Sequence, residues 1–256
     1  MRSRRGQSRF DPERARHLYV LALAIVLWPG AARADWIVSA FGGVAHTQSS
    51  TMDLNLPSQA TQVILSGVEY RGRSFQSPQY YGLRGTWIPK GRRWIGFEGE
   101  WIHAKVYAEV EGNVHAIGTL RGAPIDAAVA LSSIVNRVSM SHGLNFILAN
   151  VSARYGFGPT DATGDHRLVG VVRAGAGPTL PHAESQIDNV YFEQYESGGL
   201  GVQVGGGIEF SVWRGLGALG EYKFTWASPD IEVANGGDAK IPSRTHHFAF
   251  GVQYRF

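Results

Sequence analysis

The chain ends in the stretch THHFAFGVQYRF, in which two kinds of side chain alternate. Aromatic or apolar side chains occupy every second position from Phe248 to Phe256, and polar or small ones lie between them. A β-strand points successive side chains to opposite faces, so this stretch predicts a strand with one apolar and one polar face. In a soluble sheet a second protein layer covers the apolar face, whereas in a membrane barrel lipid covers it.

Eight segments of this chain carry a strand pattern bounded by turn residues. They are residues 35–46, 78–88, 93–107, 142–157, 168–181, 199–212, 216–227 and 245–256. Long connections (47–77, 108–141, 182–198, 228–244) alternate with shorter ones (89–92, 158–167, 213–215). This alternation is typical of outer-membrane barrels with short periplasmic turns and long outer loops. We therefore predict an all-β protein, an eight-stranded antiparallel transmembrane β-barrel over residues 35–256, in the bacterial outer membrane.

The charged residues of these segments fall mainly on the polar face. They are Arg84, Glu98, Glu100, Arg154, Arg173, Glu209, Glu221, Lys223 and Arg255. Charges of both signs inside a narrow barrel can pair with one another, while the opposite face meets lipid. An ion or proton path is the alternative, but eight strands leave no open pore, so we expect a salt-bridge network.

The first 34 residues have the features of a cleaved signal peptide. A basic lead precedes the apolar run LYVLALAIVLW, which is too short to span a bilayer as a helix, and the small-residue site Ala32-Arg33-Ala34 follows. This segment holds seven arginines and two acidic residues, a net +5, so the remainder of the +3 chain carries −2. Nucleic-acid binding therefore loses its electrostatic support. The chain has no cysteine, which excludes thiol chemistry and cysteine-ligated metals.

The outer ends of three neighbouring strands carry candidate functional side chains. His103 and Lys105 lie in EGEWIHAKVYAE, His142 and Asn145 in SHGLNF, and His182 and Glu184 in GPTLPHAES. His103, His182 and Glu184 point outward by parity, and with His142 they are candidate catalytic groups or ligands of a divalent metal of unknown identity. Candidate substrate-binding residues are Arg71, Arg73, Tyr80, Tyr81, Lys105 and Asn145.

These side chains also allow an interpretation without a catalytic or metal-binding role. Histidine and tyrosine are common anchors at a membrane interface. Ser141 beside His142 suggests a serine esterase, but adjacent residues on a strand face opposite sides, which disfavours a nucleophile–base pair. Residues 124–138 have apolar positions at helical spacing and predict a short helix in the second outer loop.

Four stretches resemble, in order and spacing, the lipid A oxidase family of alphaproteobacterial outer membranes. They are GRSFQSPQYYGLRGTW, FEGEWIHAKVYAE, SHGLNFILANVSARY and GAGPTLPHAES, and the resemblance spans most of residues 70–256. It implies an oxygen-dependent oxidation of the proximal glucosamine of lipid A to an aminogluconate unit, stimulated by a divalent metal. The segment 109–138 departs from the family pattern.

The leading hypothesis is therefore a membrane-embedded monomer that binds lipid A of the outer leaflet and oxidises it. The alternative is a non-enzymatic barrel of the small porin-like or adhesion type, whose long loops contact partners. A third hypothesis is a lipid A deacylase-type hydrolase, which needs a serine and a histidine within hydrogen-bond reach.

Overall fold

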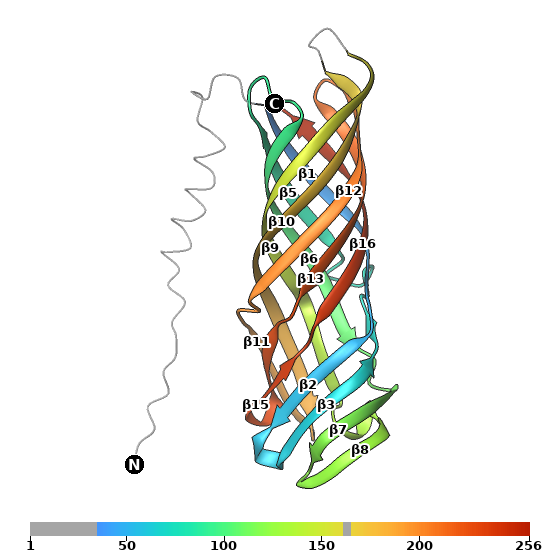
Figure 1. The fold of residues 1–256 in the computed structure, drawn as a ribbon, viewed down its shortest axis with the longest axis vertical. Helices are drawn as coiled ribbons and strands as arrows, with labels where there is room; N and C mark the ends of the chain where they lie inside the picture. The colour runs from blue at the N-terminus through green and yellow to red at the C-terminus, as the bar shows by residue number, and fades with distance from the viewer. Residues whose placement is uncertain (1–34, 161–164) are drawn as a thin grey trace, which may run out of the picture. The chain divides into compact units, whose positions relative to one another are not determined.

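The structure is a computed structural model that describes residues 35–160 and 165–256; the predicted signal peptide at 1–34 lies outside the described residues. Eight antiparallel strands close into a ring (Figure 1). In ring order they are β1 (Asp35–Thr47), β5 (Tyr81–Ile88), β6 (Ile95–Ala108), β9 (Arg137–Thr160), β10 (His166–Ile187), β12 (Leu200–Trp213), β13 (Leu216–Ala227) and β16 (Ser243–Arg255). All eight predicted strands are confirmed, as is the closed barrel.

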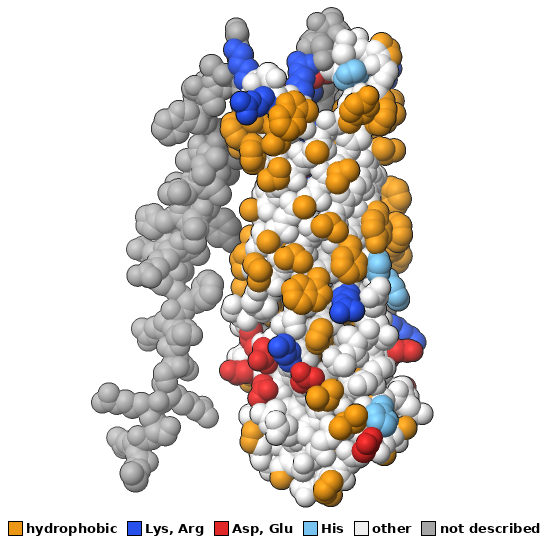
Figure 2. Space-filling model, viewed as in Figure 1, with side chains coloured by type: hydrophobic (Ala, Val, Ile, Leu, Met, Phe, Trp, Pro, Cys, Tyr) orange, Lys and Arg blue, Asp and Glu red, His pale blue; other side chains and the backbone are white. Residues whose placement is uncertain are grey.

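The alternation in the last strand sorts side chains as predicted. On β16, Phe250 and Val252 expose 70% and 59% of their surface on the outside, while His247 and Ala249 are fully buried. The other barrel strands follow the same rule, so apolar side chains are spread over the middle of the wall and charged ones gather toward its ends (Figure 2). Among the described residues, no second layer of protein covers this apolar belt. The belt is therefore suited to contact with lipid.

The interior of the barrel holds the predicted ion-pair network. Arg173 bonds Glu98 at 2.9 Å and also pairs with Glu221, which pairs in turn with Arg84 at 2.9 Å and with Lys223 at 2.8 Å. Each of these side chains is almost completely buried. Because each charge faces an opposite one, the polar faces of the strands can be enclosed without an uncompensated ion.

Three of the four long outer connections form a second, six-stranded antiparallel sheet. Its strands, in spatial order, are β14 (Asp230–Val233), β15 (Gly237–Lys240), β2 (Ser50–Leu56), β3 (Thr61–Val68), β7 (Asn113–Leu120) and β8 (Ala123–Ala130). Two further strands, β4 (Tyr70–Arg71) and β11 (Val190–Tyr195), extend the barrel sheet beside β6 and β10. Three short 3₁₀ turns, η1 (Pro57–Gln59), η2 (Leu131–Ser133) and η3 (Ala234–Gly236), complete the described elements.

The helix predicted at residues 124–138 is wrong. Its first part is strand β8, which pairs with β7 from Ala123 opposite Leu120 to Ala130 opposite Asn113, and η2 follows. Ile125 and Val129 are spaced for one face of a helix, but they also share one face of a strand. In the structure both side chains pack against the apolar core, and the backbone hydrogen bonds to β7 make the segment a strand and not a helix.

This core fills the outer end of the barrel. It joins side chains of the second sheet, such as Met52 and Leu65, to Met140 and Leu144 on β9 and Ile187 on β10, all fully buried. The end with the second sheet lies opposite the end with the C-terminus (Figure 1). Among the described residues, no helix has the length and apolar character needed to cross a bilayer.

Candidate functional site

The candidate residues lie on the outward face of the wall, just beyond the apolar belt. On β6 the outward Trp101 is followed two residues later by His103, and on β10 the outward Leu180 is followed by His182. Asn145 on β9 is opposite both His103 and Leu180, which places the three strands at one height. The prediction that these three strands are neighbours is confirmed.

A bulge in β9 gives this region its shape. Leu144 and Met140 pair with Pro181 and Ala183 on β10, so three residues of β9 stand against one of β10; the ladder to β6 shifts at the same place. Gly143, the last residue of the bulge, has φ +100°, a left-handed conformation that side chains rarely adopt. The bulge breaks the alternation of faces exactly where Ser141 and His142 lie.

The bulge brings Ser141, His142 and His182 to one point. Ser141 Oγ lies 3.2 Å from His142 Nδ1 and 3.5 Å from His182 Nδ1, and the two nitrogens are 3.3 Å apart. The expectation that Ser141 and His142 point to opposite faces is therefore wrong, because it assumed a regular strand. We call these three residues the His–Ser triangle. Burial and the neighbouring His142 lower the pKa of His182, so its imidazole is neutral at physiological pH.

The triangle has the dimensions of a site for one cation. Two imidazole nitrogens bound at 2.0–2.1 Å to one tetrahedral metal lie about 3.3 Å apart, and the same separation is observed here. The residues described by the structure contain no group of three or more His, Asp or Glu side chains placed to hold a metal. His103 and Glu184, also predicted as ligands, lie on either side of the triangle and are held by other partners.

Glu184 is fixed on one side of the triangle. It pairs with Arg137, accepts a hydrogen bond from Ser139 Oγ at 3.1 Å and another from the Tyr191 hydroxyl at 3.0 Å. Burial raises the pKa of Glu184, but the hydrogen bonds from Ser141, Arg137 and Tyr191 outweigh it, so the pKa lies below its usual value. Glu184 is thus a carboxylate that holds its neighbours in place.

His103 is fixed on the other side, through Asn145. Its Nδ1 lies 3.0 Å from Asn145 Oδ1, and its ring stacks on Tyr81 with the centroids 4.9 Å apart. The Asn145 amide nitrogen also donates to the backbone oxygens of His142 and Leu180, at 3.3 and 3.0 Å. Asn145 therefore ties His103 to the bulge, and the Nε2 atom of His103 is buried without a hydrogen-bond partner in the described chain.

Gly143 leaves room for His103 and offers a direct test. A Cβ atom at this position would lie 2.5 Å from His103 Nδ1. We expect Gly143→Ala to displace His103 and to destabilise the fold by about 1–3 kcal/mol, because a left-handed backbone is also forced on alanine. The measurement is urea unfolding of the folded barrel. Gly99→Ala is the matched control, since a Cβ there meets nothing within 4 Å; equal midpoints for both variants would contradict the expectation.

Five of the six predicted substrate-binding residues lie near the candidate site, and one lies inside the barrel. Arg73 lies over the ring of Tyr107, with Cζ 4.1 Å from the ring centre, and Lys105 Nζ lies 5.8 Å from the same centre. Arg71 pairs with Glu109 at 3.1 Å. Tyr81 and Asn145 have the positions beside His103 given above. The sixth, Tyr80, was predicted wrongly.

Tyr80 faces the interior of the barrel and not the substrate side. It exposes 3% of its surface, and its ring lies 5.4 Å from that of the buried His247. Its neighbour Tyr81 begins β5 and faces outward, so the alternation of faces sends Tyr80 inward. The prediction placed both tyrosines at the height of the site, although a strand presents only one of two adjacent side chains to each face.

Several residues of the cluster were not predicted. Tyr107, Arg137, Ser139, Tyr191 and Tyr195 all contact predicted site residues; Tyr195, for example, packs edge-on against His182 with the centroids 4.4 Å apart. Tyr191 and Tyr195 in the segment VYFEQY are four residues apart and share one strand face, which could have indicated that β11 continues the outward face of β10.

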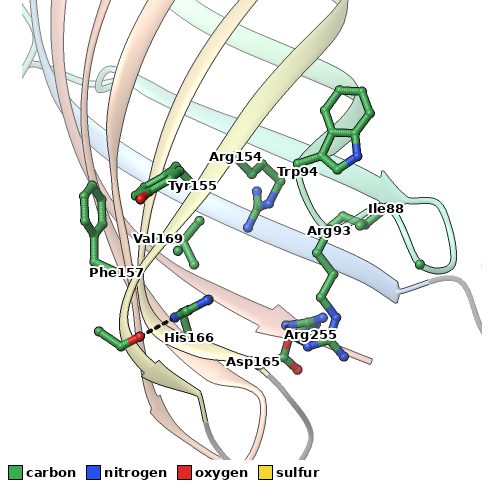
Figure 3. A pocket seen from close by; sticks show the side chains of 13 residues that line it. Ile88, Arg93, Trp94, Arg154, Tyr155, Phe157, Asp165, His166, Val169 and Arg255 are labelled. Carbon is green, nitrogen blue, oxygen red and sulfur yellow. Dashed lines mark hydrogen bonds and ion pairs between the residues drawn. The ribbon is translucent and has the colours of Figure 1, made fainter.

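A pocket of about 800 Å³ lies at the opposite end, between the short turns (Figure 3). Arg93 and Arg255 both pair with Asp165 there, at 2.7 and 2.8 Å, and Arg154 pairs with Glu209 at 2.6 Å. His166 Nδ1 lies 2.8 Å from the backbone oxygen of Gly158. These charges satisfy one another, so this pocket has the features of a structural network at the turns.

Comparison with known proteins finds similarity to solved structures of outer-membrane proteins. No protein family model matches the sequence, and no curated protein matches it. Among solved structures, the chain is similar to the outer membrane protein OprG from Pseudomonas aeruginosa (13% identity, 87% of this chain and 96% of that chain, TM-score 0.43). It is also similar to the outer membrane protease OmpT from Escherichia coli (8%, 89% and 98%, 0.43) and to Neisserial surface protein A (10%, 88% and 99%, 0.39).

The closed ring, the lipid-facing belt and the charged interior together determine where this chain resides. A barrel with an apolar exterior and short turns at one end is the form in which strands cross the bacterial outer membrane. The protein is an eight-stranded β-barrel of the bacterial outer membrane, with a cluster of histidine, serine and carboxylate side chains on its outer wall.

Proposed function

We propose that this protein is an outer-membrane enzyme that oxidises the proximal glucosamine of lipid A, as the sequence resemblance implies. The observation that carries the proposal is the His–Ser triangle: Ser141, His142 and His182 meet within 3.5 Å on the lipid-facing side of the wall. Lipid head groups of the outer leaflet reach this height directly from the membrane, without passing through the barrel.

The triangle would hold the divalent metal that the resemblance implies. His142 and His182 supply two nitrogen donors, and Ser141 supplies an oxygen. A redox-active metal bound there would supply the electron-transfer chemistry that links dioxygen to the sugar. Glu184, with its lowered pKa, stays ionised and holds Arg137 and Ser139 beside the triangle. His103, held by Asn145 and stacked on Tyr81, borders the triangle and helps to fix the bulge around it.

The overall reaction balances with dioxygen as the oxidant. The anomeric carbon of the glucosamine hemiacetal loses two electrons and two protons to give a lactone, and dioxygen takes both to become hydrogen peroxide. Water then opens the lactone to the aminogluconate. The product therefore gains one oxygen atom relative to the substrate.

Mass spectrometry of lipid A tests this proposal. We expect lipid A from aerated cells that carry the gene to gain the mass of one oxygen atom, and lipid A from cells without the gene to lack this species. Growth without oxygen is the control and should remove the difference. Identical spectra with and without the gene in air would contradict the proposal and favour the non-enzymatic porin-like or adhesion barrel.

A second candidate function, hydrolysis of an acyl ester, is favoured by the Ser141 hydroxyl beside two imidazoles. A serine nucleophile needs a histidine base that a third group orients through the other ring nitrogen. Among the described residues no carboxylate forms a hydrogen bond to His142 or His182, and Glu184 is bonded elsewhere. The same mass spectra separate the two functions, because hydrolysis removes a fatty acyl chain from lipid A and adds no oxygen.

A further inference from the structure

Two cations next to the His–Ser triangle share one aromatic ring. Arg73 lies in the segment between β4 and β5, with its guanidinium 4.1 Å from the centre of the Tyr107 ring. The ammonium of Lys105 lies 5.8 Å from the same centre. Lys105 stands between Ala104 and Val106, which are in the apolar core, so the alternation of faces directs it outward.

These two cations have no anionic partner in the described part of the chain. Lys105 exposes only 2% of its surface, and its ammonium donates one hydrogen bond, to the backbone oxygen of Gln76 at 2.9 Å. The other nearby cations are compensated: Arg71 pairs with Glu109, and Arg137 pairs with Glu184. Burial and the charge of Arg73 lower the pKa of Lys105. An anion between the two would remove their mutual repulsion and compensate their desolvation.

The segment that carries Arg73 is held in a strained form. Arg73 has φ +43°, in the left-handed region that arginine rarely adopts. Backbone bonds on either side fix it: Gln76 N donates to the oxygen of Arg73 at 3.0 Å, and Tyr80 N donates to that of Ser74 at 2.8 Å. Ser74 Oγ also accepts from the backbone nitrogen of Ala45 at 2.9 Å. Strain of this kind is frequent where a side chain must be presented to a ligand.

We propose that Arg73 and Lys105 form a binding site for a phosphate monoester, carried by the head group of an outer-leaflet lipid. An arginine fork and a lysine charge on one aromatic platform suit the oxygens of a phosphate. Tyr107 joins this site to the triangle, since it stands opposite Ser139 on the neighbouring strand, two residues from Ser141. The inference rests on the proposed function in one respect, that the bound head group is the molecule on which the triangle acts; the bound phosphate is then one carried elsewhere on the head group, because the oxidised anomeric carbon must bear a free hydroxyl.

Binding without turnover tests this site. The probes are lipid A with its phosphates, the same lipid after enzymatic removal of its phosphates, and inorganic phosphate, each titrated without oxygen against the full chain in detergent. We expect Arg73→Gln and Lys105→Met each to weaken binding of phosphorylated lipid A by about 10- to 100-fold, the effect of losing a hydrogen bond to a charged group. Binding of the dephosphorylated lipid should not change.

Controls separate this inference from loss of folding and from the proposed function. Arg121→Gln removes an exposed cation between β7 and β8 that Asp188 already pairs, and it should bind as the parent does. Lys105→Arg keeps the charge and should restore most of the affinity. Unchanged binding in the Arg73→Gln, Lys105→Met double variant would overturn the proposal. Phosphate-dependent binding to a protein that never oxidises lipid A would overturn the oxidase alone, and competition by inorganic phosphate at equal strength would assign the site to the free ion.

Discussion

Replacing His142 or His182 by alanine is expected to abolish oxidation of lipid A. Each substitution removes one of the two imidazole nitrogens that face each other at 3.3 Å, and a metal cannot be held there by the remaining imidazole and a hydroxyl. Loss of a supporting residue alone lowers metal affinity or activity about 10- to 100-fold, so loss of a ligand should exceed 100-fold. The initial rate of oxygen incorporation into lipid A, with metal content measured on the same samples, checks this expectation.

The matched control is His115→Ala, because His115 lies on the outer sheet, outside the cluster, in an exposed hydrogen-bonded contact with Asp126. It should oxidise lipid A at the parental rate. Ser141→Ala distinguishes the chemistries: an oxidase that uses both histidines keeps part of its activity, whereas a serine hydrolase loses all of it. Parental oxidation rates in both His142→Ala and His182→Ala would remove the triangle as the active centre.

The second large effect is expected in the interior of the barrel. Arg173→Met leaves Glu98 and Glu221, with 0% and 2% of their side-chain surfaces exposed, without their shared cation. Breaking a buried ion pair by removing one partner destabilises a protein by about 3–5 kcal/mol, since an uncompensated charge stays buried. We expect a correspondingly lower urea concentration at the midpoint of unfolding, followed in detergent by the gel mobility of folded and unfolded chains.

Two variants show whether the charge is the cause. Arg71→Ala breaks an exposed pair and should change stability by less than about 1 kcal/mol. Glu221 keeps Arg84 and Lys223 in this variant, so Glu98 is the carboxylate that loses its cation. Glu98→Gln added to Arg173→Met neutralises it and should recover part of the loss. A midpoint equal to that of the parent in Arg173→Met would mean that the interior network contributes little to the stability of the barrel.

The sequence predicted the barrel because strand alternation is a local property. A strand with Phe248, Phe250 and Val252 on one face and His247 and Ala249 on the other needs no knowledge of its neighbours to be recognised. The order of strands and connections then placed β6, β9 and β10 side by side, and so brought the segments around His103, Asn145 and His182 to one height. The predicted metal role of these residues remains part of the proposed function.

The second sheet could not be recognised in the same way. Its strands lie in segments such as PIDAAVALSSIV, where small and apolar residues fit a helix and a strand equally. Pairing with a partner strand from the same connection decided the matter for β8, as it did for β2 and β3. The hydrogen bonds to a partner strand cannot be inferred from the side-chain pattern of a single segment.

The sequence by itself thus determined the fold class, the charged interior and which strand ends meet on the outer wall. Only the tertiary structure decided that Ser141 and His142 face the same point as His182. A bulge adds residues to one strand while its two neighbours stay in register, so it depends on the pairing of three strands at once. The residues of a single strand carry no comparable signal, apart from the glycine that the bulge requires at position 143.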